Sequence, residues 1–382
     1  MRFVHTADWQ LGMTRHFLAG DAQPRYSAAR RDAVAGLGSL DVDFVVVAGD
    51  VFEHNQLGPQ VVSQSLEAMR AIGVPVYLLP GNHDPLDASS IYTGKLFRDE
   101  CPDNVVVLDR SGVHDVRPGL QIVAAPWRSK SPTQDLAAEV LDDLAGPPAY
   151  GVTRVLVAHG GVDVLDPDPA NPALIRLAAV EDALARGAIH YVALGDKHSV
   201  TEVGGSGRVW YSGSPEVTNF DDVEPDPGHV LVVDIDDTDP HRPVTVDVRR
   251  VGRWRFRTVR RQLDTRADIA ELDGYLDGIG DKDRTVVRLA LVGSLTVTDR
   301  AALEECLDKY SRLLAWLGAW DRHTNLVVLP GDGEFDDLGL GGFAAAAVEE
   351  LVETARSGDD ERAEHARAAL ALLLRLTDRI SA

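Results

Sequence analysis

The chain has 382 residues, of which 45% are hydrophobic and 26% charged, enough for two or three domains with a buried core. Its two cysteines, Cys101 and Cys306, exclude a disulfide scaffold and a cysteine-built zinc site, and they are typical of a cytoplasmic protein. The formal charge of -22 argues against a protein held on DNA by phosphate contacts alone. No apolar run approaches the roughly 20 residues that span a bilayer, so we expect no membrane segment.

The first 250 residues contain short β-branched runs that alternate with turns and helical patterns. We expect strands at residues 44–47, 76–79, 105–108, 155–157 and 191–194, and helices that include residues 60–72 and 133–144. Continuous apolar strands bounded by polar turns are typical of sheets buried on both faces, which predicts an α/β fold. From about Gly204, strands joined by turns indicate an antiparallel portion or a second sheet.

A second unit with the order β-α-β-α-β follows. We expect strands at residues 254–263, 285–295 and 325–329, and helices at 267–279 and 299–317, the latter capped by Asp299. Residues 331–342 are rich in glycine and aspartate and predict a linker, and the tail has leucines and alanines at helical spacing. The predicted domains are residues 1–252, a small α+β domain at 253–335, and a helical hairpin at 340–382.

Five of the predicted strands end in residue types that bind metal ions. These residues are Asp8, Asp50, Asn82 with His83, His159, and Asp196 with His198. Open α/β sheets place their sites at the carboxyl ends of strands. A single aspartate or asparagine there is usually a turn residue or a helix cap, and a single histidine is more often structural. Five coincidences at five strand ends nevertheless favour one shared site.

The ligand types indicate which metal ions would bind. Carboxylates, an amide oxygen and imidazoles without a thiolate suit manganese, magnesium or iron better than a structural zinc ion. The residues suffice for two ions that share a carboxylate, an arrangement that activates water and neutralises phosphate oxygens. His83 follows Asn82 and is a candidate for phosphate stabilisation or proton donation. We expect Asp84 to orient the His83 imidazole.

Several segments together resemble the calcineurin-like metallophosphoesterases, and most closely the SbcD-type exonuclease subunits of double-strand-break repair. These segments are residues 5–12, 49–52, Gly-Asn-His-Asp at 81–84, 159–160 and Tyr-Ser-Gly-Ser-Pro-Glu at 211–216. The resemblance covers residues 1–252 strongly and the following domain in layout only. It implies a two-sheet sandwich flanked by helices, followed by a small capping domain.

The resemblance also implies a set of ligands for two ions. One ion would be held by Asp8, Gln10, Asp50 and His198, and the other by Asp50, Asn82, His159 and Asp196, with His83 as the catalytic histidine. The family usually has histidine where this chain has Gln10 and Asp196. These changes make the site richer in oxygen, which favours manganese or magnesium, although the loss of one metal position is an alternative. The nuclease branch also tends to have a histidine near Glu53.

The remaining features bear on substrate and partners. Arg253, Arg255 and Arg257 would share one face of a strand, where they could contact a phosphate backbone or pair with nearby acidic residues. The helical tail could pack on its own domain, or, as the resemblance implies, dock onto an SbcC-like coiled-coil ATPase. Helix 60–72 lies where the family builds its homodimer interface, but its pattern equally suits core packing.

The sequence therefore predicts a manganese-dependent phosphodiesterase, with magnesium as a second possibility, that cuts DNA together with an SMC-like ATPase. Two alternatives remain open. One is an enzyme that acts on nucleotides or other small phosphodiesters, for which the charge of -22 is easier to explain. The other is a catalytically weakened scaffold, which is suggested by Gln10 and Asp196.

Overall fold

The computed structural model describes residues 1–166, 168, 170–239, 241–329, 342–356, 362–363, 365–366 and 369–370. The chain divides into two compact units, Met1–Arg255 and Phe256–Ala382. Two six-stranded sheets form within residues 1–255, and a four-stranded sheet includes the strands that follow. Within the described ranges, no helix combines the length and the apolar character that crossing a bilayer requires.

The first sheet has the strand order β12-β11-β1-β2-β3-β4. Its parallel strands are β1 (Arg2–Thr6), β2 (Phe44–Val47), β3 (Val76–Leu78) and β4 (Val105–Val107). Two antiparallel strands, β11 (His229–Ile235) and β12 (Val244–Arg250), complete it. Every residue of β2 and β3 is buried, as expected for strands covered on both faces.

The second sheet has the order β5-β6-β7-β8-β10-β9. Its parallel strands are β6 (Leu120–Ala125), β7 (Thr153–His159), β8 (Tyr191–Gly195) and β10 (Val209–Tyr211). The edge strands β5 (Gly112–Arg117) and β9 (Thr201–Glu202) pair antiparallel to their neighbours. β5 is a polar and partly exposed strand, which its sequence does not distinguish from a turn.

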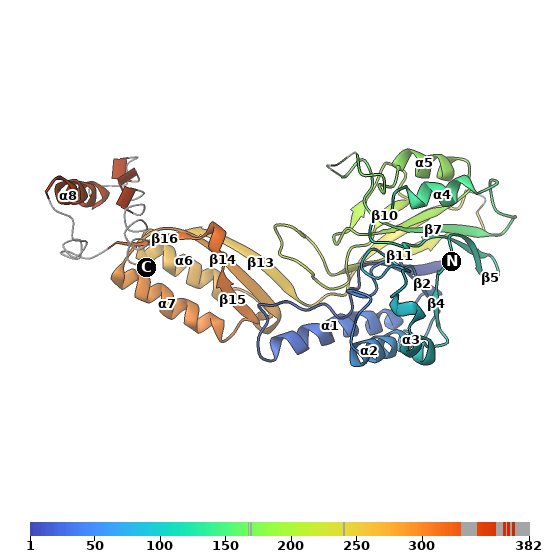
Figure 1. Cartoon of the computed structure of the whole chain (residues 1–382), viewed down its shortest axis with the longest axis horizontal. Helices are drawn as coiled ribbons and strands as arrows, with labels where there is room; N and C mark the ends of the chain where they lie inside the picture. Colours follow the sequence, from blue (N-terminus) through green and yellow to red (C-terminus); the bar gives the residue numbers. More distant parts are fainter. Residues whose placement is uncertain are drawn as a thin grey trace. The chain divides into compact units, whose positions relative to one another are not determined.

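Helices cover the outer face of each sheet (Figure 1). The first sheet packs against α1 (Ala22–Gly36), α2 (Pro59–Arg70) and α3 (Lys95–Glu100), with 3-10 turns at Leu37–Ser39 and Ile91–Thr93, and the second against α4 (Leu136–Asp142) and α5 (Leu177–Ala185). Between the sheets, the Phe3 ring stacks on Phe44 with centroids 4.8 Å apart and meets Tyr191 edge-on at 5.6 Å. This arrangement confirms the predicted two-sheet fold flanked by helices.

The second unit is built around a sheet with helices packed against it. Its elements are β13 (Arg255–Gln262), α6 (Arg266–Asp277), β14 (Thr285–Thr296), α7 (Val297–Ser311), β15 (Trp316–Ala319) and β16 (Asn325–Leu329), with 3-10 turns at Lys282–Arg284 and Asp321–His323. β14 pairs in parallel with both β15 and β16. Leu272 of α6 and Leu303 of α7 pack with Leu289 of β14 in the core.

The prediction for α7 was wrong at both ends. The helix ends at Ser311 instead of residue 317, and residues 316–319 form β15. Leucines at 313, 314 and 317 continue a helical spacing, but β15 pairs with residues 286–289 of β14, which periodicity along the chain does not reveal. The N-cap is Thr296, whose hydroxyl accepts the Asp299 N–H at 3.1 Å, rather than Asp299 itself.

The last described element is α8 (Phe343–Arg356). Val348 and Ala355 on this helix pack with Ala366 and Leu370, which follow it in the chain. Residues 330–341 and most of the predicted hairpin after residue 356 lie outside the described residues. The predicted linker and helical tail therefore stay predictions over those segments.

Candidate metal centre

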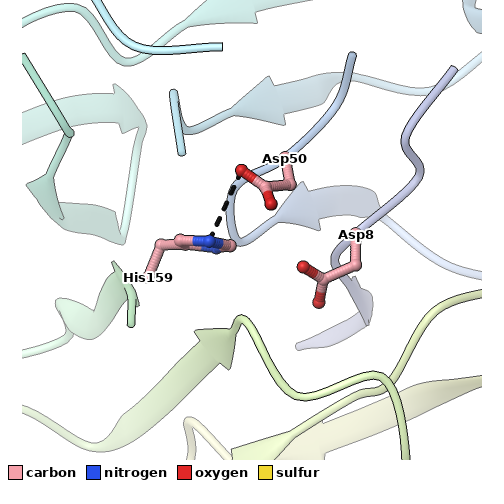
Figure 2. A group of neighbouring side chains, drawn as sticks. All are labelled: Asp8, Asp50 and His159. Carbon is pink, nitrogen blue, oxygen red and sulfur yellow. Dashed lines mark ion pairs between the residues drawn. The ribbon is translucent and has the colours of Figure 1, made fainter. Parts of the chain in front are cut away.

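The predicted metal ligands lie at or just after the carboxyl ends of β1, β2, β3, β7 and β8. In chain order they are Asp8, Gln10, Asp50, Asn82, His159, Asp196 and His198. Figure 2 shows Asp8, Asp50 and His159 pointing toward one another, and one ligand atom from each lies within 4.8 Å of the others. The first three strands belong to one sheet and the last two to the other, so the centre lies where the two sheets present their carboxyl ends.

Four of these residues have left-handed backbone conformations. The φ angle is 53° at Asp8, 42° at Gln10, 52° at Asp50 and 103° at Asp196, and only two other non-glycine residues of the described part have positive φ. Each such residue costs about 1–3 kcal/mol and persists only where its surroundings impose the conformation. Here the loops hold each other, because the Asp8 N–H donates to the Gly49 carbonyl at 3.0 Å and the Gln10 N–H to the Asp50 carbonyl at 2.9 Å.

Two glycines let the strand ends approach closely. A Cβ atom at Gly49 would lie 2.1 Å from Nδ1 of His159, and one at Gly81 would lie 2.2 Å from Oδ1 of Asp50. A larger residue at either position would displace a predicted ligand. The glycines that precede Asp50 and Asn82 therefore have a steric role at the centre.

Asp50, Asn82, His159 and Asp196 form one part of the centre, which we call the Asn82 half. Nδ1 of His159 donates to the Ala48 carbonyl at 2.8 Å. Its Nε2 lies 3.4 Å from Oδ1 of Asp50 and 4.0 Å from Oδ1 of Asp196. One terminal atom of the Asn82 carboxamide is 2.7 Å from the same nitrogen and 3.2 Å from both oxygens of Asp50, a position that suits its NH2 group in the absence of an ion. This convergence of candidate ligand groups fits a divalent cation.

The charge state of the centre also fits a cation. Burial, together with the charges of Asp50 and Asp196, raises the pKa of Asp8 well above its usual range, and burial raises the pKa of Asp196. Burial disfavours the His159 imidazolium, but the carboxylates of Asp50, Asp8 and Asp196 outweigh this effect and raise the pKa of His159 to about 9. A bound cation would replace that proton as the balancing charge, because imidazole binds metals in its neutral form.

Asp8, Gln10 and His198 form the other part, which we call the Gln10 half. The Asp8 carboxylate accepts the Asp196 N–H at 3.1 and 3.2 Å, and its Oδ1 lies 3.9 Å from Nε2 of His198. Nε2 of Gln10 is 3.4 Å from that same histidine nitrogen. Oε1 of Gln10 is buried and has no hydrogen-bond partner. Because a cation can satisfy a buried acceptor, this half also has a donor set that fits a metal ion.

His198 is oriented by residues that the sequence did not single out. Its Nδ1 lies 2.6 Å from the Thr218 hydroxyl, which also contacts the Glu224 carboxylate at 3.1 Å. Burial lowers the pKa of His198 to about 4, so the imidazole is neutral at pH 7. Its Nδ1–H donates to Thr218 when that hydroxyl donates to Glu224, which leaves the Nε2 lone pair toward the centre. No local motif marks Thr218 or Glu224.

Two further buried residues support the first loop. Oγ of Ser214 lies 2.8 Å from the Asp8 carbonyl, and Nε of Arg30 donates to the Trp9 carbonyl at 3.2 Å. They bind the carbonyls of the strained segment that carries Asp8 and Gln10. Ser214 lies within the segment 211–216 that carries the family resemblance, a signal that could have found it. Arg30 is in the middle of α1 and has no such signal.

His83 and Asp84 have separate roles in the structure. The His83 N–H donates to Oδ1 of Asp50 at 2.9 Å, and the ring Nδ1 lies 2.9 Å from the Glu53 carbonyl. The Asp84 carboxylate instead accepts the N–H groups of Gly81 and Phe52 at 2.8 and 3.0 Å, together with the hydroxyl of Tyr92 at 2.5 Å. The expected orienting contact from Asp84 to the imidazole is thus made by Glu53, and Asp84 holds the loop.

The three arginines predicted to bind substrate lie where the chain enters the second unit. Arg253 precedes β13, and its N–H donates to the Glu216 carboxylate at 2.9 Å. Arg255 and Arg257 are in β13 and are partly buried. The predicted contact of these three arginines with substrate stays a prediction.

The chain is similar to several known proteins. The sequence profile of the calcineurin-like phosphoesterases matches residues 1–233. The DNA double-strand break repair protein Mre11 of Archaeoglobus fulgidus is 32% identical over 90 residues, 22% of this chain and 19% of that protein. The SbcD subunit of the nuclease SbcCD from Rhodobacter capsulatus is 27% identical over 276 residues, 61% of this chain and 66% of that protein. The chain thus spans less than two thirds of either relative.

Two solved structures also match. One is a protein of Thermus thermophilus, with a TM-score of 0.40 and 10% identity over 65% of this chain and 98% of that one. The other is a dimetal phosphatase from Danio rerio, with a TM-score of 0.38 and 13% identity over 65% of this chain and 96% of that one. The family match covers more than half of the chain. It runs from β1 into β11 and includes every predicted metal ligand. The chain therefore belongs to the calcineurin-like phosphoesterases, a family of metal-dependent hydrolases.

Proposed function

We propose that this chain is a manganese-dependent phosphodiesterase that hydrolyses DNA and acts in the cytoplasm in DNA repair, with magnesium as an alternative ion. The observation that carries the proposal is the convergence of Asp8, Asp50 and His159 on one buried centre, with the side chains of Asn82 and Asp196 beside them. The names of the two curated relatives, a nuclease subunit and a double-strand break repair protein, support DNA as the substrate.

The ligands divide between two ions that share Asp50. Bound there, the ions would lower the pKa of a water molecule and neutralise charge on the phosphate. The chain's own contribution is to hold the ligands in place before substrate binds, through the interlocked loops of Asp8 and Asp50. We assign one set to Asp50, Asn82, His159 and Asp196, and the other to Asp8, Gln10, Asp50 and His198.

His83 is the residue that we propose to act on the phosphate. Its side chain is 36% exposed, whereas that of Asp50 beside it is 3% exposed. The Glu53 carbonyl holds Nδ1, and Nε2 lies 3.9 Å from Oδ2 of Asp50, at the edge of the centre where a phosphate would bind. In the imidazolium form, Nε2–H would bind a phosphate oxygen or give its proton to the leaving oxygen.

For substrate and partners we propose the features that the family resemblance implies. Arg253, Arg255 and Arg257 would bind the DNA backbone, because guanidinium groups bind phosphate in a bidentate manner. The helical segment that contains α8 would dock onto an SbcC-like coiled-coil ATPase, and α2 would contribute to a homodimer. These assignments rest on the two nuclease relatives and on the amphipathic pattern of the tail.

Specific observations favour two other candidate functions. The charge of -22 would disturb hydrolysis of nucleotides or other small phosphodiesters less than binding of a polyanion. The neutral amide of Gln10 and the extra carboxylate of Asp196, where the family usually has histidines, would suit a weakened enzyme that serves as a scaffold for the ATPase. Both keep the fold and differ from the main proposal in substrate turnover.

The test is degradation of end-labelled linear DNA, duplex and single-stranded, by the purified chain in Mn2+. Asp50→Asn removes a negatively charged ligand and keeps the side chain's shape, so we expect it to abolish the activity. Asp142→Asn makes the same chemical change at an exposed position at the end of α4 and should leave the activity unchanged.

Each outcome separates the candidates. Degradation that requires metal and disappears only in Asp50→Asn would support the proposal. Turnover of a nucleotide diester without any degradation of DNA would replace it with the small-substrate function. No turnover of either substrate, even with a candidate ATPase and ATP, would leave the scaffold.

A further inference from the structure

Basic side chains gather at the amino ends of β7, β8 and β10, three neighbouring strands of the second sheet. Arg154 is the second residue of β7, His190 directly precedes β8, and Arg208 directly precedes β10. Arg242, in the loop before β12, joins them, because its carbonyl accepts Nη2 of Arg208 at 3.4 Å and its Nη1 donates to the Thr153 hydroxyl. We call the three arginines and His190 the His190 cluster.

The His190 cluster lies far from the metal centre. β7 has Arg154 at its amino end and the predicted ligand His159 at its carboxyl end. At a rise of about 3.3 Å per residue, these two residues are about 16 Å apart. β8 likewise places His190 and Asp196 at opposite ends. A ligand of the cluster would therefore not contact the metal ions.

The ring of His190 has an N–H group that no described residue accepts. The backbone N–H of Arg154 donates to Nδ1 at 2.9 Å, which fixes the ring proton on Nε2. Burial, together with the positive charges of the three arginines, lowers the pKa of His190 to about 4. The ring is thus neutral at pH 7 and presents Nε2–H as a donor to a ligand.

Arg208 and Arg242 also have donors that the described residues do not use. Arg208 donates through Nη2 alone, to the carbonyls of His241 and Arg242 at 3.1 and 3.4 Å, and Arg242 donates through Nη1 alone. No described carboxylate forms an ion pair with either guanidinium group. Arg242 is nevertheless only 8% exposed, and a charged group that is so deeply buried usually has a partner of opposite charge.

Arg154 adds a positive charge that its own contacts do not cancel. Its guanidinium group donates to Oε1 of Gln121 at 2.8 and 3.0 Å and to the carbonyls of Gly146 and Ala188, each at 3.0 Å. All three acceptors are neutral. The charge of Asp115 acts on Arg154 from the far side of Gln121, whose Nε2 donates to that carboxylate at 2.8 Å.

The backbone of Arg242 is held in an unfavourable conformation. Its φ angle is 45°, in the left-handed region that four of the predicted metal ligands also adopt. Its N–H donates to the Asp239 carbonyl at 2.9 Å. Such conformations persist only where the surroundings impose them, and they concentrate at binding and catalytic sites. The fold therefore fixes the start of this side chain beside His190.

We propose that the His190 cluster binds a small anion with a phosphate group, either inorganic phosphate or a phosphate monoester. Two guanidinium groups and a ring N–H supply donors for several phosphate oxygens, and Arg154 adds a third positive charge. Arg154 and Arg242 are 8% exposed and His190 is 9% exposed, so the site suits a small anion better than the backbone of a duplex. The inference does not depend on the proposed function, because its residues and its test involve no hydrolysis.

The test is a titration of the metal-free, full-length chain with inorganic phosphate in a chloride buffer at neutral pH. Calorimetry gives the affinity and stoichiometry, and the ring NMR signals of His190 in histidine-labelled chain report the place of binding. We expect one saturable site and a shift of the His190 signals. Arg208→Gln and Arg242→Gln should each weaken binding about tenfold or more, because each removes a charge-assisted hydrogen bond.

Arg249→Gln is the matched control, because it removes the same charge from an exposed position on β12. It should leave the affinity unchanged. Arg208→Lys keeps the charge without the planar fork and should lose less affinity than Arg208→Gln. Near-UV circular dichroism checks that each variant is folded. If a variant is not folded, the His190 signals of the wild-type chain decide.

A parallel titration with AMP distinguishes the two sources of the phosphate group. Tighter binding of AMP than of phosphate would identify a monoester, and equal or weaker binding would identify inorganic phosphate. No saturable binding of either anion, binding that leaves the His190 signals unchanged, or an equal loss of affinity in Arg249→Gln would each overturn the inference. A duplex oligonucleotide that shifts these signals when neither small anion does would replace the small ligand with a polyanion.

Discussion

His83 and Asp84 are neighbours in the sequence but have different structural roles. His83 presents a partly exposed imidazole that is held by one backbone carbonyl. Asp84 is fully buried and accepts hydrogen bonds from Gly81, Phe52 and Tyr92. The first arrangement suits contact with a substrate, and the second holds the loop between β3 and α3 in its shape.

Substitution of His83 should therefore lower activity, whereas substitution of Asp84 should lower stability. His83→Ala should lower kcat by about 10²–10⁴-fold, the usual contribution of a general acid, and leave Mn2+ binding unchanged. Asp84→Ala leaves three buried donors without an acceptor and should lower the free energy of unfolding by about 3 kcal/mol or more. Urea denaturation and Mn2+ titration of both variants check this, with Asp84→Asn as the control that keeps an acceptor oxygen. Equal losses of stability in the two alanine variants would contradict the assignment of a catalytic role to His83 and a structural role to Asp84.

The proton on His159 predicts how Mn2+ binding depends on pH. Its pKa is raised to about 9 in the folded chain, so the proton adds to stability below the ordinary pKa near 6.5 and this contribution is lost as the pH rises through 9. A metal must displace that proton, so Mn2+ affinity should rise about tenfold per pH unit from pH 6.5 to 8.5. Titrations at three pH values measure the slope. An affinity that does not change with pH would mean that His159 is neutral before the ion binds.

The candidate ligands could be predicted from the sequence because each follows a strand that its own residues reveal. The residues that orient them could not. Ser214 is 206 positions from Asp8, Arg30 is 21 from Trp9, and Thr218 is 20 from His198. Such pairs meet only through the folding of both sheets, and a hydroxyl or a guanidinium in a helix carries no sign of its partner.

At the scale of elements, buried parallel strands were predictable and short edge strands were not. β2 and β3 are wholly buried valine-rich runs, and a continuous apolar run is the pattern that such strands require. β15 has four partly buried or exposed residues and follows closely after α7, so its leucine and tryptophan fit a helical spacing equally well. Only its pairing with β14 decides between the two, and that pairing depends on tertiary structure.

The start of α7 gives a prediction at this scale. The Thr296 hydroxyl accepts the Asp299 N–H at 3.1 Å and donates to the Asp299 carboxylate at 2.8 Å. Thr296→Ala should destabilise the first turn by about 1 kcal/mol, which corresponds to roughly fivefold faster amide exchange there. Thr298→Ala makes the same change at an exposed position within the turn and serves as the control. Equal exchange rates in the two variants would show that Thr296 does not cap the helix.

At the scale of the whole molecule, the charge opposes the proposed substrate. The chain has 60 acidic and 38 basic residues, so DNA is repelled at long range and must be bound by local contacts. Salt acts on these two effects in opposite directions. It screens the repulsion, because the Debye length falls as ionic strength rises, and it weakens each arginine–phosphate contact through counterion release.

The salt dependence of DNA binding therefore measures how many contacts the chain makes. Three phosphate contacts, from Arg253, Arg255 and Arg257, would lower the affinity about 40-fold between 50 and 200 mM salt, and screening of the repulsion offsets part of that loss. Changing any one of these arginines to alanine should reduce the slope of log affinity against log salt concentration by about one.

Fluorescence anisotropy with the Asp50→Asn variant, which we expect to bind DNA without cutting it, measures this slope directly. A loss of about 10³-fold or more would require six or more contacts and hence a larger basic surface. A slope that no arginine variant changes would place the DNA contacts elsewhere on the chain.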